Sequence, residues 1–171
     1  GCWTGSQANL VCIDHDGDEL WSNTYGAPVS AFYGLRETGD GIVAAGRTLY
    51  GGHSDIFVVK TDFNGEAIDS VLISLQRNQD CNSIVSKPEG GFVLGCGFWR
   101  GDGSHDKDMG IVFIDQDLRV ETWNRFEIED TYEGCACIAK ITPRGYALVG
   151  SRIYWGDDMH WDSRQPMAIR A

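Results

Sequence analysis

Three segments of the sequence combine aromatic, histidine and carboxylate side chains, and they read RTLYGGHSD, FWRGDGSHDKD and RIYWGDDMHWDSRQ. Aromatic rings stack on the apolar faces of sugars while carboxylates accept hydrogen bonds from hydroxyl groups, so these loops could form a glycan-binding rim. Imidazole and carboxylate groups can also hold a divalent metal, but the histidines do not align residue for residue, and we predict no metal here. As a third interpretation, the aspartates only cap loops and the rings cover junctions between structural units. The rim candidates are Tyr50, His53, Asp55, Trp99, His105, Asp108, Trp155, Asp158, His160 and Trp161.

The best carboxylate cluster for catalysis lies in the third segment, where Asp157, Asp158 and Asp162 stand beside Trp155 and Trp161. A glycosidase needs two carboxylates at a defined separation, which spacing within a loop does not establish. The sequence contains no G-x-S-x-G nucleophile motif, no phosphate-binding glycine loop and no H-E-x-x-H zinc motif. We therefore expect a protein without catalytic activity, and keep a carbohydrate-active enzyme as the alternative.

A calcium site is the other chemistry that the sequence suggests, because Asp14, Asp16 and Asp18 alternate around a glycine. Similar segments begin at Asp62 and Asp115, and the distal glutamate of a calcium loop is absent at its required spacing. Recurrence at one place favours hairpin turns in which the first aspartate caps backbone amides. We expect no cofactor, with calcium as the alternative.

The sequence contains six cysteines, an even number, and no two of them have the spacing of a zinc or haem motif. Disulfides in an oxidising compartment are the expected use, and buried free thiols are the alternative. If the turn at 87–90 folds two strands together, Cys81 faces Cys96 and the two are predicted to form a disulfide. Cys135 is expected opposite Gly150. The pairing of the remaining four stays open: Cys2, Cys12, Cys135 and Cys137.

Length and charge narrow the class of protein. With 171 residues and 42% hydrophobic side chains, the chain can form one domain with a substantial core. A net charge of −11 argues against nucleic acid and anionic membranes as partners. No apolar run is long enough to span a bilayer, so we predict no transmembrane segment. Together with the cysteines, this favours an extracellular or cell-surface location.

Two independent landmarks repeat along the chain with a period of about fifty residues. The turn aspartates Asp14, Asp62 and Asp115 are 48 and 53 residues apart. The segments GIVAAG, GFVLGC and GYALVG begin at positions 41, 91 and 145, which are 50 and 54 residues apart. Because both landmarks share one period, we interpret the chain as a true structural repeat.

Each repeat contains four short β-like runs separated by turn residues, the pattern of a propeller blade. We predict an all-β fold of one repeat domain spanning 1–171. Its form is a β-propeller or partial propeller of four-stranded antiparallel blades. The blades are expected at about 7–50, 55–100 and 108–153, with 165–171 as the first strand of a fourth.

The second repeat also contains the pattern D-x-x-V-x-K-x-D-x-x-G, formed by Asp55, Val58, Lys60, Asp62 and Gly65. This pattern resembles the blade repeat of secreted and cell-surface bacterial and archaeal β-propellers. The resemblance implies a fold and a surface location, and it implies no activity. The other repeats depart from the pattern at Cys12, Phe113 and Leu118.

Three blades leave open sheet edges, which proteins normally cover. Other copies of the chain, or the rest of a longer chain, could complete a ring or propagate as a filament. We therefore expect a non-enzymatic extracellular module for binding or assembly, whose partners are further copies or a longer chain, and glycans as a further option. The alternatives are a glycan-binding or glycan-active propeller and the subunit of an extracellular filament.

Overall fold

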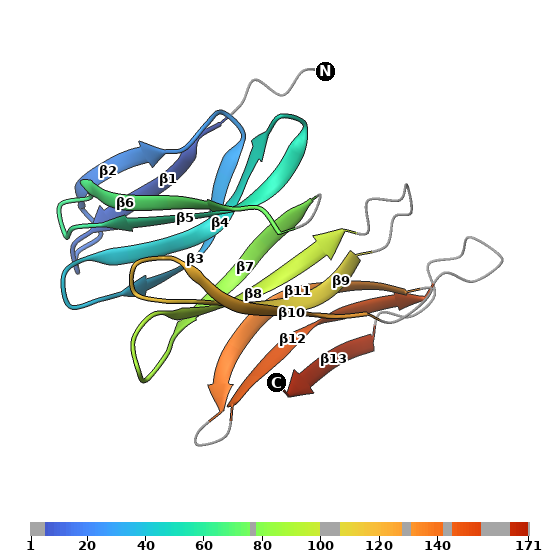
Figure 1. Cartoon of the computed structure of the whole chain (residues 1–171). Coiled ribbons are helices and arrows are strands. Elements are labelled where there is room, and N and C mark those ends of the chain that lie inside the picture. Colours follow the sequence, from blue (N-terminus) through green and yellow to red (C-terminus); the bar gives the residue numbers. More distant parts are fainter. Residues whose placement is uncertain are drawn as a thin grey trace.

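The computed structural model describes residues 6–75, 78–99, 107–127, 131–141, 145–154 and 165–170, which form β-strands and no helix (Figure 1). Every strand pair is antiparallel, and the two central sheets have four strands each. The all-β class and the four-stranded antiparallel sheets are therefore confirmed. None of the described residues belongs to a helix long and apolar enough to cross a membrane.

The strands form four sheets, which we label A to D in chain order. Sheet A contains β1 (Ala8–Ile13) and β2 (Glu19–Tyr25). Sheet B contains β3 (Ser30–Glu37), β4 (Ile42–Tyr50), β5 (His53–Thr61) and β6 (Ala67–Ile73). Sheet C contains β7 (Gln79–Ser86), β8 (Phe92–Trp99), β9 (Lys107–Ile114) and β10 (Val120–Phe126). Sheet D contains β11 (Thr131–Ile141), β12 (Gly145–Tyr154) and β13 (Gln165–Arg170).

The sheets are out of phase with the predicted units by two strands. The predicted units start at β1, β5 and β9, whereas sheets B, C and D start at β3, β7 and β11. Each four-stranded sheet thus combines the last two strands of one predicted unit with the first two of the next. A sequence repeat fixes the period of a structure, but the hydrogen bonds between strands decide where each sheet begins.

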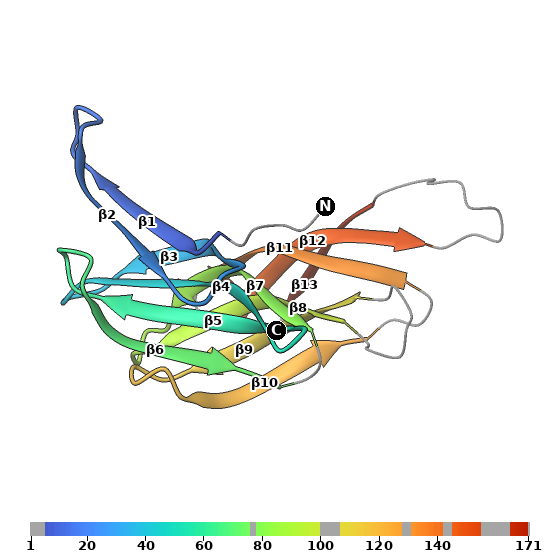
Figure 2. The ribbon, with the colours of Figure 1, turned by 90° about the horizontal axis from the view of Figure 1, so that it is seen from above.

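The four sheets stack face to face, with sheets A and D at the two ends (Figures 1 and 2). Alternate residues of β5 therefore point to different neighbours. Phe57 and Val59 pack with Leu10 of sheet A, while Ile56 and Val58 pack against sheet C. Because sheets B and C are covered on both faces, their central strands are apolar almost throughout, which accounts for the runs IFVV and GIVFI.

The turn aspartates cap their hairpins in the same way in all three repeats. Asp14 Oδ1 accepts hydrogen bonds from the amides of Asp16 and Asp18, both at 2.9 Å. The Oδ1 atoms of Asp62 and Asp115 each accept two amide hydrogen bonds at the same offsets. The carboxylate of Asp14 thus serves the turn, as the recurrence of the motif indicated. These turns lie at one end of the stack, which we call the turn end.

Residues at the same sequence offset from the turn aspartates occupy equivalent positions in successive sheets, and three such sets lie just before the turns. They are Val11, Val59 and Val112; Cys12, Lys60 and Phe113; and Ile13, Thr61 and Ile114.

A register shift also recurs at one place in the first strands of sheets B, C and D. It lies next to the pairs Phe32–Gly46, Cys81–Cys96 and Cys135–Gly150. The predicted positions of Cys81 opposite Cys96, and of Cys135 opposite Gly150, are therefore confirmed.

Candidate functional site

The predicted glycan rim is described only in part. His105, Trp155, Asp158, His160 and Trp161 lie outside the described residues. Tyr50, His53, Asp55, Trp99 and Asp108 lie at the ends of β4, β5, β8 and β9 opposite the turn end. We call this second end of the stack the loop end. Tyr50 is opposite His53 across the β4–β5 hairpin, and its side chain is 68% exposed.

The two described rim carboxylates instead contact protein groups. Asp55 Oδ1 accepts a hydrogen bond from Gln79 Nε2 at 3.3 Å, which connects sheet B to sheet C. Asp108 is fully buried and its Oδ2 lies 3.1 Å from Arg125 Nε on the adjacent strand. Buried beside Arg125, Asp108 contributes to the packing of sheet C, and a role for it on a binding rim stays a prediction.

A buried ion pair at the loop end was missed by the sequence reasoning. Lys107 Nζ lies 2.7 Å from Asp80 Oδ2, and the two side chains are almost fully buried. Lys107 Nζ also lies 5.3 Å from the centre of the Trp99 ring, within the range of a cation–π contact. A Cβ atom at Gly97 would collide with the ends of the Lys107 and Asp80 side chains, so the glycine leaves the space that the pair occupies. The only signal for this pair in the sequence was that glycine, next to Cys96.

The predicted disulfide between Cys81 and Cys96 is not formed, although the two residues are opposite each other. Cys12, Cys81, Cys96, Cys135 and Cys137 are all free thiols, and Cys2 lies outside the described residues. Directly opposite residues have Cβ atoms about 4.5–5.5 Å apart, whereas a disulfide brings them to about 3.5–4.5 Å. Cys81 Sγ instead donates a hydrogen bond to the Ser83 carbonyl oxygen at 3.4 Å.

Cys81, Cys96 and Cys135 are part of the apolar core between the sheets. Burial, with a smaller contribution from the neighbouring Cys81 thiol, raises the pKa of Cys96 well above its ordinary value. Burial likewise raises the pKa of Cys135 to about 12. Thiols that stay protonated at neutral pH are poor nucleophiles and poor metal ligands. The described part of the chain also contains no group of three or more histidine, cysteine, aspartate or glutamate residues arranged to hold a metal ion.

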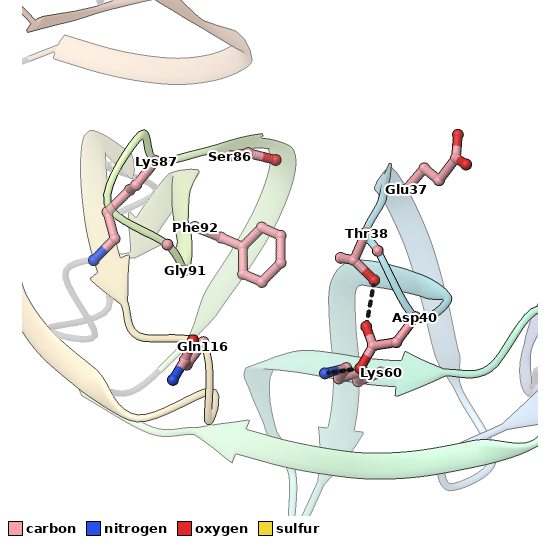
Figure 3. A pocket seen from close by; sticks show the side chains of 11 residues that line it. Glu37, Thr38, Asp40, Lys60, Ser86, Lys87, Gly91, Phe92 and Gln116 are labelled. Carbon is pink, nitrogen blue, oxygen red and sulfur yellow. Dashed lines mark hydrogen bonds and ion pairs between the residues drawn. The ribbon is translucent and has the colours of Figure 1, made fainter.

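A hollow lies at the turn end, between sheets B and C. Its volume is about 370 Å³. One wall is formed by the β3–β4 turn and Lys60 of β5, and the other by the β7–β8 turn, Phe92 and Gln116 (Figure 3). The Phe92 ring points into the space between the two walls (Figure 3). None of the five described rim residues lines this cleft, because they lie at the other end of the strands.

An ordered polar network lies on the sheet B side of the cleft. Lys60 Nζ is 2.8 Å from Asp40 Oδ2, and Thr38 Oγ1 donates to Asp40 Oδ1 at 2.8 Å. The hydrogen bond from Lys60, and then that from Thr38, lower the pKa of the exposed Asp40 carboxyl. Lys87 on the other wall directs its amino group to Glu121, away from the cleft (Figure 3). The cleft therefore presents both hydrogen-bond donors and acceptors, with its lysines already paired.

Comparison with known proteins adds no family to this description. No protein-family model matches the chain, and no curated protein is significantly similar to it. The fold defines the class of protein, which is an all-β chain of antiparallel sheets stacked face to face.

Proposed function

We propose that this chain is a non-enzymatic β-propeller module of secreted or cell-surface type, which assembles head to tail with further copies of itself. Its stack of antiparallel sheets and its fifty-residue repeat support the propeller. The resemblance of its second repeat to the blades of secreted and cell-surface propellers supports an extracellular location. The two ends of the stack support the assembly. Ring closure and an open filament are both compatible with such contacts.

The observation that carries the proposal is the exposure of Val11. Its equivalents Val59 and Val112 are 1% and 0% exposed because each packs against the preceding sheet, whereas Val11 is 52% exposed. The same holds for Ile13, which is 58% exposed, whereas its equivalents Thr61 and Ile114 are both fully buried. The outer face of sheet A is thus built for burial against a preceding sheet.

The outer face of sheet D also exposes an apolar side chain at a position that is buried in an earlier sheet. Val149 is 45% exposed, whereas its equivalent Ala45 is fully buried against the following sheet. A contact between the outer face of sheet A in one copy and the outer face of sheet D in the next would cover both apolar faces. Burial of apolar surface is the driving force that we expect for association.

The test is the solution mass of the purified chain by light scattering over a concentration series, with negative-stain images of the same samples. We expect a defined oligomer or filaments for the native chain. The variant Val11→Lys places a charge in the proposed contact and should shift the mass to that of a monomer. Leu72→Lys on β6, where the native side chain is 48% exposed, is the matched control and should assemble normally. A native chain that stays monomeric at the highest concentration would overturn self-assembly, and would assign the covering sheet to a longer chain.

Glycan binding at the loop end is a second candidate, favoured by the exposed Tyr50 beside His53. Tyr50→Ala removes the only described rim ring with most of its surface free, so loss of glycan binding in this variant would support it. Unchanged binding would remove Tyr50 from any glycan site.

A further inference from the structure

We propose that the cleft between the β3–β4 and β7–β8 turns binds a small neutral polyhydroxylated ligand, of the size of a mono- or disaccharide. This proposal is independent of the assembly proposed above, because it concerns the turn end between sheets B and C.

A comparison of successive sheets shows why a hollow exists at this place. Between sheets C and D, Phe113 of β9 points to the next sheet and packs edge to face with Tyr146, with ring centres 5.7 Å apart. The equivalent positions between sheets B and C are occupied by Lys60 and Phe92. Lys60 does not reach across to Phe92 as Phe113 reaches Tyr146. It pairs instead with Asp40 of its own sheet, so the space beside the Phe92 ring stays open.

The size of the hollow restricts the ligand. Ligand sites in proteins have volumes of roughly 300–1,000 Å³. At about 370 Å³ the cleft lies near the lower limit of this range. A ligand of one or two sugar rings fits this volume, whereas a peptide of several residues would extend beyond it.

The chemistry of the walls restricts the ligand further. Hydroxyl groups of Thr38 and Ser86, the amide of Gln116 and the Asp40–Lys60 pair offer donors and acceptors on both sides of the cleft. An anionic ligand such as a phosphate ester would need a surplus of positive charge, but Lys60 and Lys87 are each paired with a carboxylate. A cation would need a surplus of negative charge. The Asp40 carboxylate is already compensated by Lys60, and Glu37, the other carboxylate of the lining, points away from the Phe92 ring (Figure 3). A neutral ligand with many hydroxyl groups satisfies these walls best.

The polar wall is also held in place before a ligand arrives. Asp40 is fixed by two hydrogen bonds, and the turn that carries it is closed by a 2.8 Å bond from the Thr38 amide to the Gly41 carbonyl oxygen. Phe92, which is only 6% exposed and packs in the apolar core between sheets B and C, gives the cleft an apolar floor. Preorganised groups lose little conformational entropy on binding, which favours a small ligand that can make few contacts.

The proposal is tested by two-dimensional amide NMR of the full chain with a panel of neutral sugars. The panel contains glucose, galactose, mannose, N-acetylglucosamine and their β-linked disaccharides, with inorganic phosphate and glycine as charged comparisons. At least one sugar is expected to shift the amide signals of the β3–β4 and β7–β8 turns in a saturable way. Phosphate and glycine should leave these signals unchanged.

The sharpest variant is Lys60→Phe, which introduces the aromatic residue that the third repeat already holds at this position. It should fill the cleft and weaken sugar binding at least tenfold while the fold is preserved. Lys140→Phe is the matched control, because Lys140 is an exposed lysine on β11, away from the cleft, and binding should be unchanged. Thr38→Val removes a hydroxyl group at nearly constant volume, and a three- to tenfold weakening is expected even if Lys60→Phe should not fold.

Three results would overturn the proposal. The first is the absence of any saturable shift at the turn end with every sugar of the panel at tens of millimolar. The second is full binding by the Lys60→Phe and Thr38→Val variants. The third is a set of shifts confined to Tyr50 and His53, which would assign sugar binding to the loop end instead.

Discussion

Asp80 and Lys107 form an ion pair with an oxygen–nitrogen distance of 2.7 Å inside the protein, where their side chains are only 9% and 7% exposed. The pair spans β8, joining the first and third strands of sheet C in a space that Gly97 leaves open. Asn82 donates to the same carboxylate at 3.3 Å and to the Cys135 carbonyl oxygen at 2.9 Å. The pair therefore belongs to the contact between sheets C and D as well.

Removal of one partner should destabilise the protein strongly. Asp80→Ala leaves the Lys107 ammonium without its counterion in a buried position, and a loss of about 3–5 kcal/mol in the free energy of unfolding is expected. Urea denaturation followed by tryptophan fluorescence measures it. Arg119→Ala is the control, since its pair with Asp117 is exposed and contributes at most about 1 kcal/mol. Equal losses in the free energy of unfolding for the two variants would show that the buried pair stabilises the protein no more than an exposed pair does.

Leu118 replaces the turn glycine of the other repeats, and its effect on stability should separate into two parts. Its φ of 60° is strained for a residue with a Cβ atom, whereas its side chain is 1% exposed within the core. Leu118→Ala loses the core contacts and keeps the strain, which should cost about 2–5 kcal/mol. Leu118→Gly loses the same contacts but relieves the strain, so it should be less destabilising than alanine by about 1 kcal/mol. Urea midpoints of the two variants provide the comparison, and a glycine variant less stable than the alanine variant would refute the account of strain.

The Asp40 carboxyl should titrate below its ordinary pKa of 3.8, because Lys60 and Thr38 stabilise its charged form. Carboxyl-detected carbon NMR measures this value directly. Lys60→Met should raise the pKa of Asp40 toward 3.8, while Lys140→Met should leave it unchanged. Since the folded pKa is the lower one, the pair stabilises the protein above pH 3.8, and this contribution is lost as the pH falls through the folded pKa. An Asp40 pKa at or above 3.8 in the native chain would show that the Lys60 contact does not persist in solution.

Cys135 should resist modification until the protein unfolds. Its thiol is 4% exposed, and its pKa of about 12 keeps it protonated at pH 8. Iodoacetamide followed by peptide mapping should modify the exposed Cys137 first, and Cys135 only in urea. Because the folded pKa exceeds the ordinary value of 9.0, the protonated thiol stabilises the fold below pH 9, and this contribution is lost as the pH rises toward 12. The loss of stability between pH 9 and 12 should therefore be smaller in Cys135→Ala than in the native chain.

The local part of this structure could be read from the sequence. The hairpin turns at Asp14, Asp62 and Asp115 follow from short-range hydrogen bonds between a carboxylate and amides two and four residues later. The register that places Cys81 opposite Cys96 followed from the position of one turn. Such features depend on residues close together in the chain, so a repeat pattern and turn chemistry are enough to predict them.

The properties of the candidate sites depended instead on which sheet faces which. Asp108 has the same position in its repeat as Asp55, yet only Asp108 is fully buried beside an arginine. The cleft exists because Lys60 pairs with Asp40 within its own sheet, where the equivalent Phe113 packs on the next sheet. The phase of the sheets and the burial of Val59 and Val112 also follow from contacts between segments far apart in the chain. The sequence by itself determined the period, the turns and the all-β class, because these arise within single hairpins. Only the packing of one sheet on another decided what is buried, what is paired and where a ligand has room.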